Sequence, residues 1–194
     1  MGSPPAGRAY WNNKIKGDQG FVKAAKHYFQ QETACFPETD YAFLSTAAER
    51  KAQGYEYAQK NSHSFPVEEI NHLISFSMGA AFGEGMLAFF DEKGILFKSA
   101  YHLCPYQAPF IELTQNPQRF ILDYQLKWDF VTHSPFLLLL KITQRGQIPG
   151  ASLFIEDARK SPLFWYRLHR APIFKNDCIW AFFGQQTKHH SSKN

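Results

Sequence analysis

Two histidines and two carboxylates are the residues of this chain best suited to acid–base chemistry. Imidazole titrates near neutral pH, so a histidine oriented by a carboxylate can accept a proton and return it. His102 and His133 are the candidate bases, and Glu84 and Asp129 are the carboxylates that could assist either of them. These four residues form the candidate catalytic set, which would need an aromatic-lined pocket around it.

Two members of this set, His102 and Glu84, also have simpler explanations. His102 and Cys104 stand two apart, which on a strand puts both side chains on one face, where a third ligand could complete a metal site. That spacing is common by chance, so we predict a half-buried histidine beside a buried thiol, with no metal and no cofactor. Glu84 is costly to bury without a partner, and a place at the surface is favoured over a functional one. His169 with Asp177 is a further base and carboxylate pair.

Recognisable nucleophile and phosphate motifs do not accompany these residues. We find no Gly-x-Ser-x-Gly elbow, so a hydrolase triad would depend on scattered residues alone. Gly79, Gly83 and Gly85 match neither the dinucleotide fingerprint nor the phosphate-binding loop. Close packing of a helix against a sheet is the favoured use of these glycines.

The run from Lys160 to Arg170 mixes aromatic and basic residues. Such a mixture can anchor a partner protein or stack on bases, although the signature of RNA-recognition sheets is absent. The plainest alternative is an edge strand whose basic residues lie in solvent. If the run binds a partner, the anchors are Phe164, Trp165, Tyr166 and Arg167.

Composition describes one globular domain. The 194 residues are 44% hydrophobic, 20% charged and 16% aromatic, which is too apolar for a disordered chain. A chain of this length buries roughly 70% of its unfolded surface around one core. The 21 Lys and Arg and 17 Asp and Glu give a net charge of +4, and the basic residues are scattered, so nucleic acid is an unlikely partner.

The ends of the chain and its cysteines indicate where it resides. We expect a flexible leader over 1–17, one domain over 18–184 and a disordered polar tail over 185–194. No apolar run approaches the length that membrane insertion needs, and the leader lacks an apolar signal region. Three widely spaced cysteines argue against a disulfide framework. These features predict a cytoplasmic protein with free thiols.

The first part of the chain shows helical spacing. An amphipathic face at Phe21, Ala25, Tyr28 and Phe29 follows a possible cap at Asp18. A second helix is expected over about 40–60. A third begins near 66, carries apolar residues at Ile70, Ile74 and Met78, and ends near 82–85. Small residues at its far end would let another backbone approach closely.

From about residue 86 the spacing changes to that of strands. A hairpin is expected between 86–90 and 95–103, with Gly94 at positive φ in the turn. After a turn at 115–118, apolar and polar residues alternate from Phe120 to Phe130, which predicts one buried and one solvated face. A second hairpin is expected between 136–142 and 151–155, and further strands at 163–168 and 178–183.

This order of elements predicts an α+β fold: N-terminal helices followed by a meandering antiparallel β-sheet packed on a central helix. The arrangement is loosely similar to the hot-dog and NTF2-like folds. These folds host acyl-thioester enzymes, small-ligand pockets and noncatalytic scaffolds, so the likeness alone implies no single function.

Two function hypotheses follow. The first is a noncatalytic binding module, adaptor or chaperone-like, that uses an aromatic surface or pocket to take up a partner protein or an apolar small molecule. The alternative is a hot-dog-like or NTF2-like enzyme that acts on an acyl-thioester or small apolar substrate with a His and carboxylate pair. The oligomeric state is left open.

The first hypothesis makes a direct prediction. Trp165→Ala should abolish capture of a co-purifying partner while circular dichroism and the melting temperature stay unchanged, because a surface anchor contributes to binding and not to the core. Capture equal to that of the unaltered chain would contradict the hypothesis.

Overall fold

The computed structural model describes residues 21–31, 45–65, 70–127, 129, 146–158 and 180. Contacts divide the chain into two compact units, 1–40 with 170–194, and 41–169, and each is described by itself. The expected leader and tail and the strands predicted at 136–142, 163–168 and 178–183 lie almost wholly outside the described residues.

The first unit contains helix α2 (Phe21–Phe29). The ring centroids of Phe21, Tyr28 and Phe29 lie 5.2, 5.1 and 6.0 Å from that of Trp180. Residues seven and eight apart share a helix face, so one indole can contact all three rings. The helix predicted from this spacing is confirmed.

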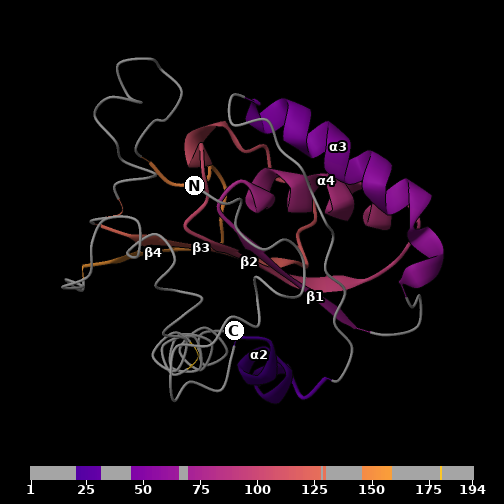
Figure 1. Cartoon of the computed structure of the whole chain (residues 1–194), viewed down its shortest axis with the longest axis horizontal. Helices are drawn as coiled ribbons and strands as arrows, with labels where there is room; N and C mark the ends of the chain where they lie inside the picture. Colours follow the sequence, from indigo (N-terminus) through magenta and orange to yellow (C-terminus); the bar gives the residue numbers. More distant parts are fainter. Residues whose placement is uncertain are drawn as a thin grey trace, which may run out of the picture. The chain divides into compact units, whose positions relative to one another are not determined.

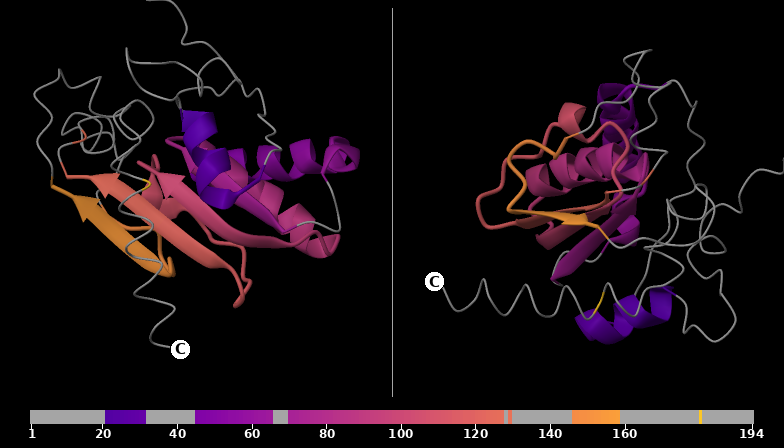
Figure 2. Two further views of the ribbon diagram at one scale, coloured as in Figure 1. Left: turned by 90° about the horizontal axis from the view of Figure 1, so that it is seen from below. Right: turned by 90° about the vertical axis from the view of Figure 1, so that its left-hand side faces the viewer.

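Within the described residues, the second unit contains a parallel sheet of four strands in chain order. Helices α3 and α4 lie on one side of it (Figure 1), and the strand arrows point the same way (Figure 2, left). Helix α4 packs on β1, β2 and α3. The elements are α3 (Ala47–Lys60), η1 (Ser62–Ser64), β1 (Asn71–Phe76), α4 (Gly79–Glu92), β2 (Phe97–Leu103), η2 (Ala108–Phe110), β3 (Phe120–Leu126) and β4 (Leu153–Asp157).

The antiparallel meander predicted from the sequence is therefore wrong. Helix α4 returns the chain from the end of β1 to the start of β2, which makes these two strands parallel. The connection from β2 to β3 also crosses over α4, because Ile111 packs with Ala81 of that helix. Alternation along Phe120–Leu126 correctly indicated a strand, but alternation carries no information about the direction of the neighbouring strands. Hot-dog and NTF2-like folds are excluded with the antiparallel sheet.

The predictions for 70–78 and 86–90 are wrong, whereas the helix predicted over 79–85 is present as the first half of α4. Residues 71–76 form a strand where a helix was predicted, and 86–90 belong to a helix where a strand was predicted. The fourfold spacing of Ile70, Ile74 and Met78 imitates a helix face. Helix α4 is apolar around most of its surface because the sheet covers one side and α3 the other, so its sequence lacks the usual polar stripe.

Gly94 has the positive φ expected of it, +70°, but in a different structure. The amide of Ile95 donates to the carbonyl of Phe90 (2.9 Å), and the amide of Gly94 donates to that of Asp91 (3.1 Å). These two bonds form a Schellman motif, which ends α4. A helix end and a hairpin turn both favour glycine, and this ambiguity explains the mistaken hairpin.

A capping box starts helix α3. The amide of Glu49 donates to Thr46 Oγ1 (3.2 Å), and the amide of Thr46 donates to Glu49 Oε2 (2.7 Å). The bond from the Thr46 amide is the main cause that lowers the pKa of Glu49. The second helix predicted from the sequence is thus confirmed from Ala47 to Lys60.

Two glycines let α3 and α4 approach backbone to backbone. A Cβ on Gly54 of α3 would lie 1.9 Å from the Phe82 carbonyl oxygen, and one on Gly85 of α4 would lie 1.8 Å from that of Lys51. Neither distance is sterically possible, so both positions require glycine. The close packing of helix on sheet predicted for the glycines holds for Gly83, which faces Leu73 and Ser75 of β1, but Gly85 approaches another helix and Gly79 meets nothing within 4 Å.

Gly85→Ala should lower the free energy of unfolding by about 2 kcal/mol or more, because its methyl group forces the two helix backbones apart. Gly79→Ala is the matched control in the same helix, since a Cβ there meets nothing within 4 Å. Urea denaturation of both variants measures the difference, and equal effects would contradict the close-approach explanation.

Candidate functional site

A row of polar side chains crosses the sheet beneath α4. Ser75 of β1 pairs in register with His102 of β2, which pairs with Asp123 of β3. Partners in register point to the same face of a sheet. All three residues are buried, and Ser75 lies under Gly83 of α4. The face of β3 that was predicted to be solvated is therefore covered.

His102 connects the sheet to α4. Its Nδ1 lies 2.7 Å from Ser75 Oγ and its Nε2 lies 2.9 Å from Glu84 Oε1. The other carboxylate oxygen of Glu84 accepts a hydrogen bond from the Thr114 amide (2.7 Å). The side chains of His102 and Glu84 are both 0% exposed, so the surface position favoured for Glu84 is wrong.

The hydrogen bonds decide the charge of Glu84. Burial alone would raise its pKa, but the hydrogen bond and electrostatic attraction of His102, with the Thr114 amide, outweigh burial and bring the pKa below its usual value. The carboxylate is therefore ionised and accepts a hydrogen bond from the imidazole Nε2–H.

This chain of Ser75, His102 and Glu84 has the order of a serine, a base and an acid, but a substrate does not reach it. All three side chains are buried between α4 and the sheet. A shallow hollow elsewhere among the described residues, of about 10 Å³, lies between α3, α4 and the segment 110–112. The structure thus joins the predicted pair His102 and Glu84 as a packed polar cluster.

Asp123 lies in the same row and is held by donors. The Ile148 amide donates to its Oδ2 (2.7 Å), and Gln125 Nε2 donates to both oxygens at 3.1 and 3.0 Å. Burial raises the pKa of Asp123 to about 6, although these hydrogen bonds and the attraction of His102 oppose the shift.

A second group of residues lies where the strands end, the edge at which parallel sheets commonly bind ligands. Ser77 occupies the turn between β1 and α4 with φ +54°, a left-handed conformation that is unusual for serine. Its amide donates to the Leu103 carbonyl (3.0 Å), and its own carbonyl accepts from Tyr106 (3.1 Å) and Ala80 (3.2 Å). Unlike Ser75, Ser77 is only partly buried.

The end of β2 carries the same kind of backbone strain. Cys104 and Gln107 have φ +46° and +60°. Such outliers gather at functional sites, where the surrounding structure holds them. Cys104 is a free, buried thiol. Burial, followed by the charge of Asp129, raises its pKa well above the usual value, which keeps it in the protonated, unreactive form.

Asp129 lies at this edge, apart from the buried cluster. It follows β3, where its amide donates to the Leu126 carbonyl (3.0 Å) and its side chain bonds to Cys104. Asp129 is completely buried. It is therefore the one member of the predicted catalytic set that the structure places at the same sheet edge as Ser77.

The remaining predicted residues cannot be placed. His133, His169, Asp177 and the aromatic anchors 164–167 lie outside the described residues. Among the residues that are described, no three His, Cys, Asp or Glu side chains gather as a metal site would require. In the same part of the chain, every helix is too short or too polar to cross a membrane.

Ser77 is the residue that sequence reasoning missed. The signal is Ser75-Phe76-Ser77-Met78-Gly79, in which small residues stand two positions before and two after a serine. A search for glycine at both positions overlooked it, because Ser75 replaces the first glycine. Assigning 66–85 to a helix also hid the strand and the turn that give the pattern its meaning.

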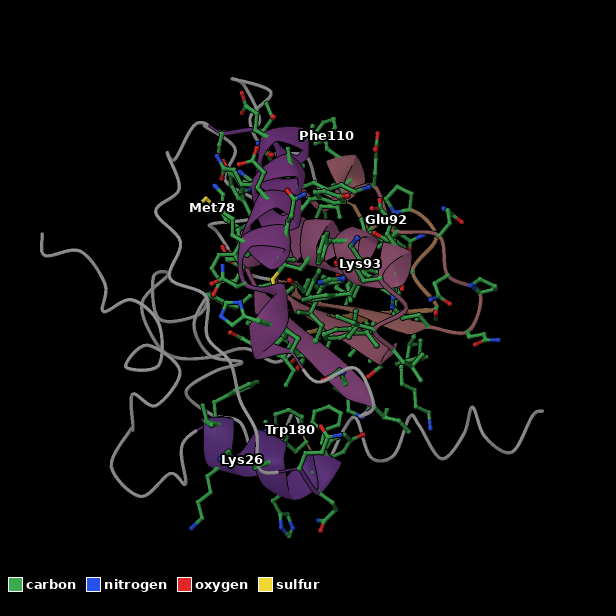
Figure 3. All side chains as sticks on the ribbon, turned by 90° about the vertical axis from the view of Figure 1, so that its right-hand side faces the viewer. Lys26, Met78, Glu92, Lys93, Phe110 and Trp180 are labelled. Carbon is green, nitrogen blue, oxygen red and sulfur yellow. The ribbon has the colours of Figure 1, made fainter. Side chains whose placement is uncertain are left out.

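Figure 3 shows Met78 at the start of α4, with Glu92 and Lys93 at the other end of the helix. Ser77 directly precedes Met78 and follows the last residue of β1, so it lies at the end of α4 at which β1 terminates. Comparisons of the chain with protein-family models, curated proteins and solved structures found no match.

Asp123 makes stability depend on pH. Its folded-state pKa of about 6 exceeds the reference value of 3.8, so its contribution is complete below about pH 3.8 and is lost as pH rises through about 6. A shift of this size corresponds to about 3 kcal/mol. An Asn at this position does not titrate, so Asp123→Asn lacks this loss. The free energy of unfolding of the variant minus that of the unaltered chain should therefore rise by about 3 kcal/mol from pH 4 to pH 7, as measured by urea denaturation. A difference that is constant with pH would contradict this assignment.

Proposed function

We propose that the protein is a serine hydrolase, which transfers the acyl group of an ester or thioester to Ser77 and then to water. The observation that carries this proposal is the left-handed φ of Ser77 on a tight turn from a parallel strand into a helix. A serine on such a strained strand-to-helix turn is the nucleophile elbow of the α/β-hydrolases, where the turn presents the hydroxyl at the carboxyl edge of the sheet.

The amide of Met78 is suited to stabilise the oxyanion. In an elbow, the backbone N–H of the residue after the nucleophile is one donor of the oxyanion hole. Met78 immediately precedes the first residue of α4 and caps that helix without a side-chain hydrogen bond. The first N–H groups of a helix lack intrahelical acceptors, and the positive end of the helix dipole favours developing negative charge there.

Asp129 is suited to orient the catalytic base. Ser77 follows β1 and Asp129 follows β3, so the two backbones are about two strand spacings, roughly 10 Å, apart. An imidazole between them can bond to both side chains. In α/β-hydrolases the triad residues follow one another along the chain in the order Ser, acid, His. Both His133 and His169 follow Asp129 in this chain, as that order requires.

The reaction then follows from these roles. The base takes the Ser77 proton as the hydroxyl oxygen attacks the acyl carbonyl carbon, and it gives that proton to the leaving alcohol or thiol. Water, deprotonated by the same base, attacks the acyl-serine; as the bond between the acyl carbon and the Ser77 oxygen breaks, the base gives this proton to the Ser77 oxygen and the acid is released. Asp129 keeps the imidazole in the tautomer that this sequence of transfers requires.

This proposal changes the enzyme hypothesis drawn from the sequence and leaves the binding-module hypothesis as it stands. The acyl chemistry of the alternative hypothesis is kept, but on a different fold and with Ser77 added. The binding module anchored by 164–167 stays a prediction that Trp165→Ala tests. An apolar small molecule as substrate and a cytoplasmic location are parts of the proposal.

A fluorophosphonate probe tests the nucleophile. We expect the probe to modify the unaltered chain at Ser77, identified by mass spectrometry of the labelled peptide, and Ser77→Ala to abolish both labelling and hydrolysis of p-nitrophenyl butyrate. Ser64→Ala is the control, because Ser64 is an exposed serine in η1. Labelling of another serine, or no labelling of the folded chain, would refute the proposal.

Separate variants test the proposed acid, Asp129, and the two candidates for the base. Asp129→Asn should lower kcat by about 10³-fold or more, because the imidazole then takes the wrong tautomer. His133→Gln and His169→Gln are compared side by side, and only the variant that removes the base should lose activity to the same extent as Ser77→Ala. Full activity in both histidine variants would exclude these two residues as the base.

A further inference from the structure

The imidazole of His102 links the two arms of the turn that carries Ser77. The arm before the turn is β1, where Ser75 lies two residues before Ser77 and bonds to Nδ1 (2.7 Å). The arm after the turn is α4, where Glu84 lies seven residues after Ser77 and bonds to Nε2 (2.9 Å). His102 itself belongs to neither arm, because it lies on β2.

Thr114 strengthens the connection to α4. Its amide donates to Glu84 Oε2 (2.7 Å), and its hydroxyl donates to the Glu84 carbonyl (2.9 Å). Glu84 is therefore held at its side chain and its backbone by the connection that follows β2. The Glu84 carboxylate, from the first half of α4, and its partner His102 thus connect this helix to β1 and to the β2 to β3 connection.

Strained backbone persists only where the surrounding structure holds it. Backbone hydrogen bonds to Leu103, Tyr106 and Ala80 hold Ser77 itself. These bonds act at the turn, whereas the angle between the strand and the helix that meet there also depends on contacts made farther along each of them. Hydrogen bonds are directional and apolar contacts are not, so the buried polar cluster sets that angle more tightly than an apolar core would.

We infer that His102 is a positioning residue for Ser77: by bonding Ser75 and Glu84 at once, it holds the strand and the helix in the orientation that aims the Ser77 hydroxyl. This inference rests on the proposed function. His102 does not contact the substrate, because its side chain is buried on the face of the sheet beneath α4. Its effect on the reaction is therefore indirect and geometric.

Kinetics of two His102 variants test the inference. We expect His102→Ala to lower kcat for p-nitrophenyl butyrate by about 10-fold to 100-fold with KM changed less than twofold, because a misplaced nucleophile slows the chemical step without weakening substrate binding. His102→Gln, whose amide can bond to both arms, should recover part of the lost kcat. Rates are measured well below the melting temperature of each variant, and circular dichroism confirms that each is folded.

Asp91→Asn is the matched control for lost stability. Asp91 lies at the other end of α4 and pairs with Arg119, so its variant loosens the same helix away from the turn. It should lower the melting temperature and leave kcat unchanged. If folded His102→Ala keeps full kcat, or if Asp91→Asn loses kcat equally, the positioning role is overturned.

The two proposals fail in different ways. Fluorophosphonate labelling of Ser77 in the unaltered chain, together with full kcat in His102→Ala, would overturn the positioning role and leave the hydrolase intact. If the unaltered chain is not labelled at Ser77, the hydrolase proposal fails and the positioning role fails with it. If His102→Ala does not fold, Ser75→Ala is the substitute, because it removes only the hydrogen bond between Ser75 and His102. A lowered kcat in Ser75→Ala would then support the positioning role, and an unchanged kcat would overturn it.

Discussion

The hydrogen bonds of one buried imidazole organise the described sheet. His102 bonds to a serine on the neighbouring strand and to a glutamate on the helix above, and the glutamate in turn holds the connection to the third strand. Removing any partner would leave a buried polar group unsatisfied, which is costly in a water-free interior. This cluster therefore ties the parallel strands, the covering helix and the turn between them to a single arrangement.

Parallel pairing determines where reactive groups can meet. All four strands end at the same edge, so side chains that follow different strands come together there although they are far apart in sequence. Ser77 follows the first strand, Cys104 the second and Asp129 the third. An antiparallel meander would send the ends of neighbouring strands to opposite edges, and Ser77 and Cys104 would not share a site.

The sequence alone predicted local features and missed long-range ones. The helix at Phe21–Phe29, the strand at Phe120–Leu126 and the positive φ of Gly94 depend on neighbouring residues, and these features were predicted correctly. The solvated face expected of that strand and the hairpin expected at Gly94 were wrong. Whether two neighbouring strands are parallel depends on the path that the chain takes between them. The composition of residues 104–119, which connect β2 to β3, does not reveal that path. Glu84 and His102 were proposed in one candidate set, but which carboxylate assists which histidine was left open, because the contact depends on a helix whose later residues, 86–90, imitate a strand.

The strand order also bears on how the chain reaches this structure. Ala100 pairs with Ile121, and Leu122 pairs with Leu153, so the sheet joins residues about 20 and about 30 positions apart. Closing such loops costs entropy before any contact compensates for it, and topologies rich in distant pairs fold slowly. Until β3 and β4 are in place, β2 presents an unpaired edge to other nascent chains. The same parallel order that gathers the strand ends thus leaves a period during synthesis when the chain is most prone to aggregate.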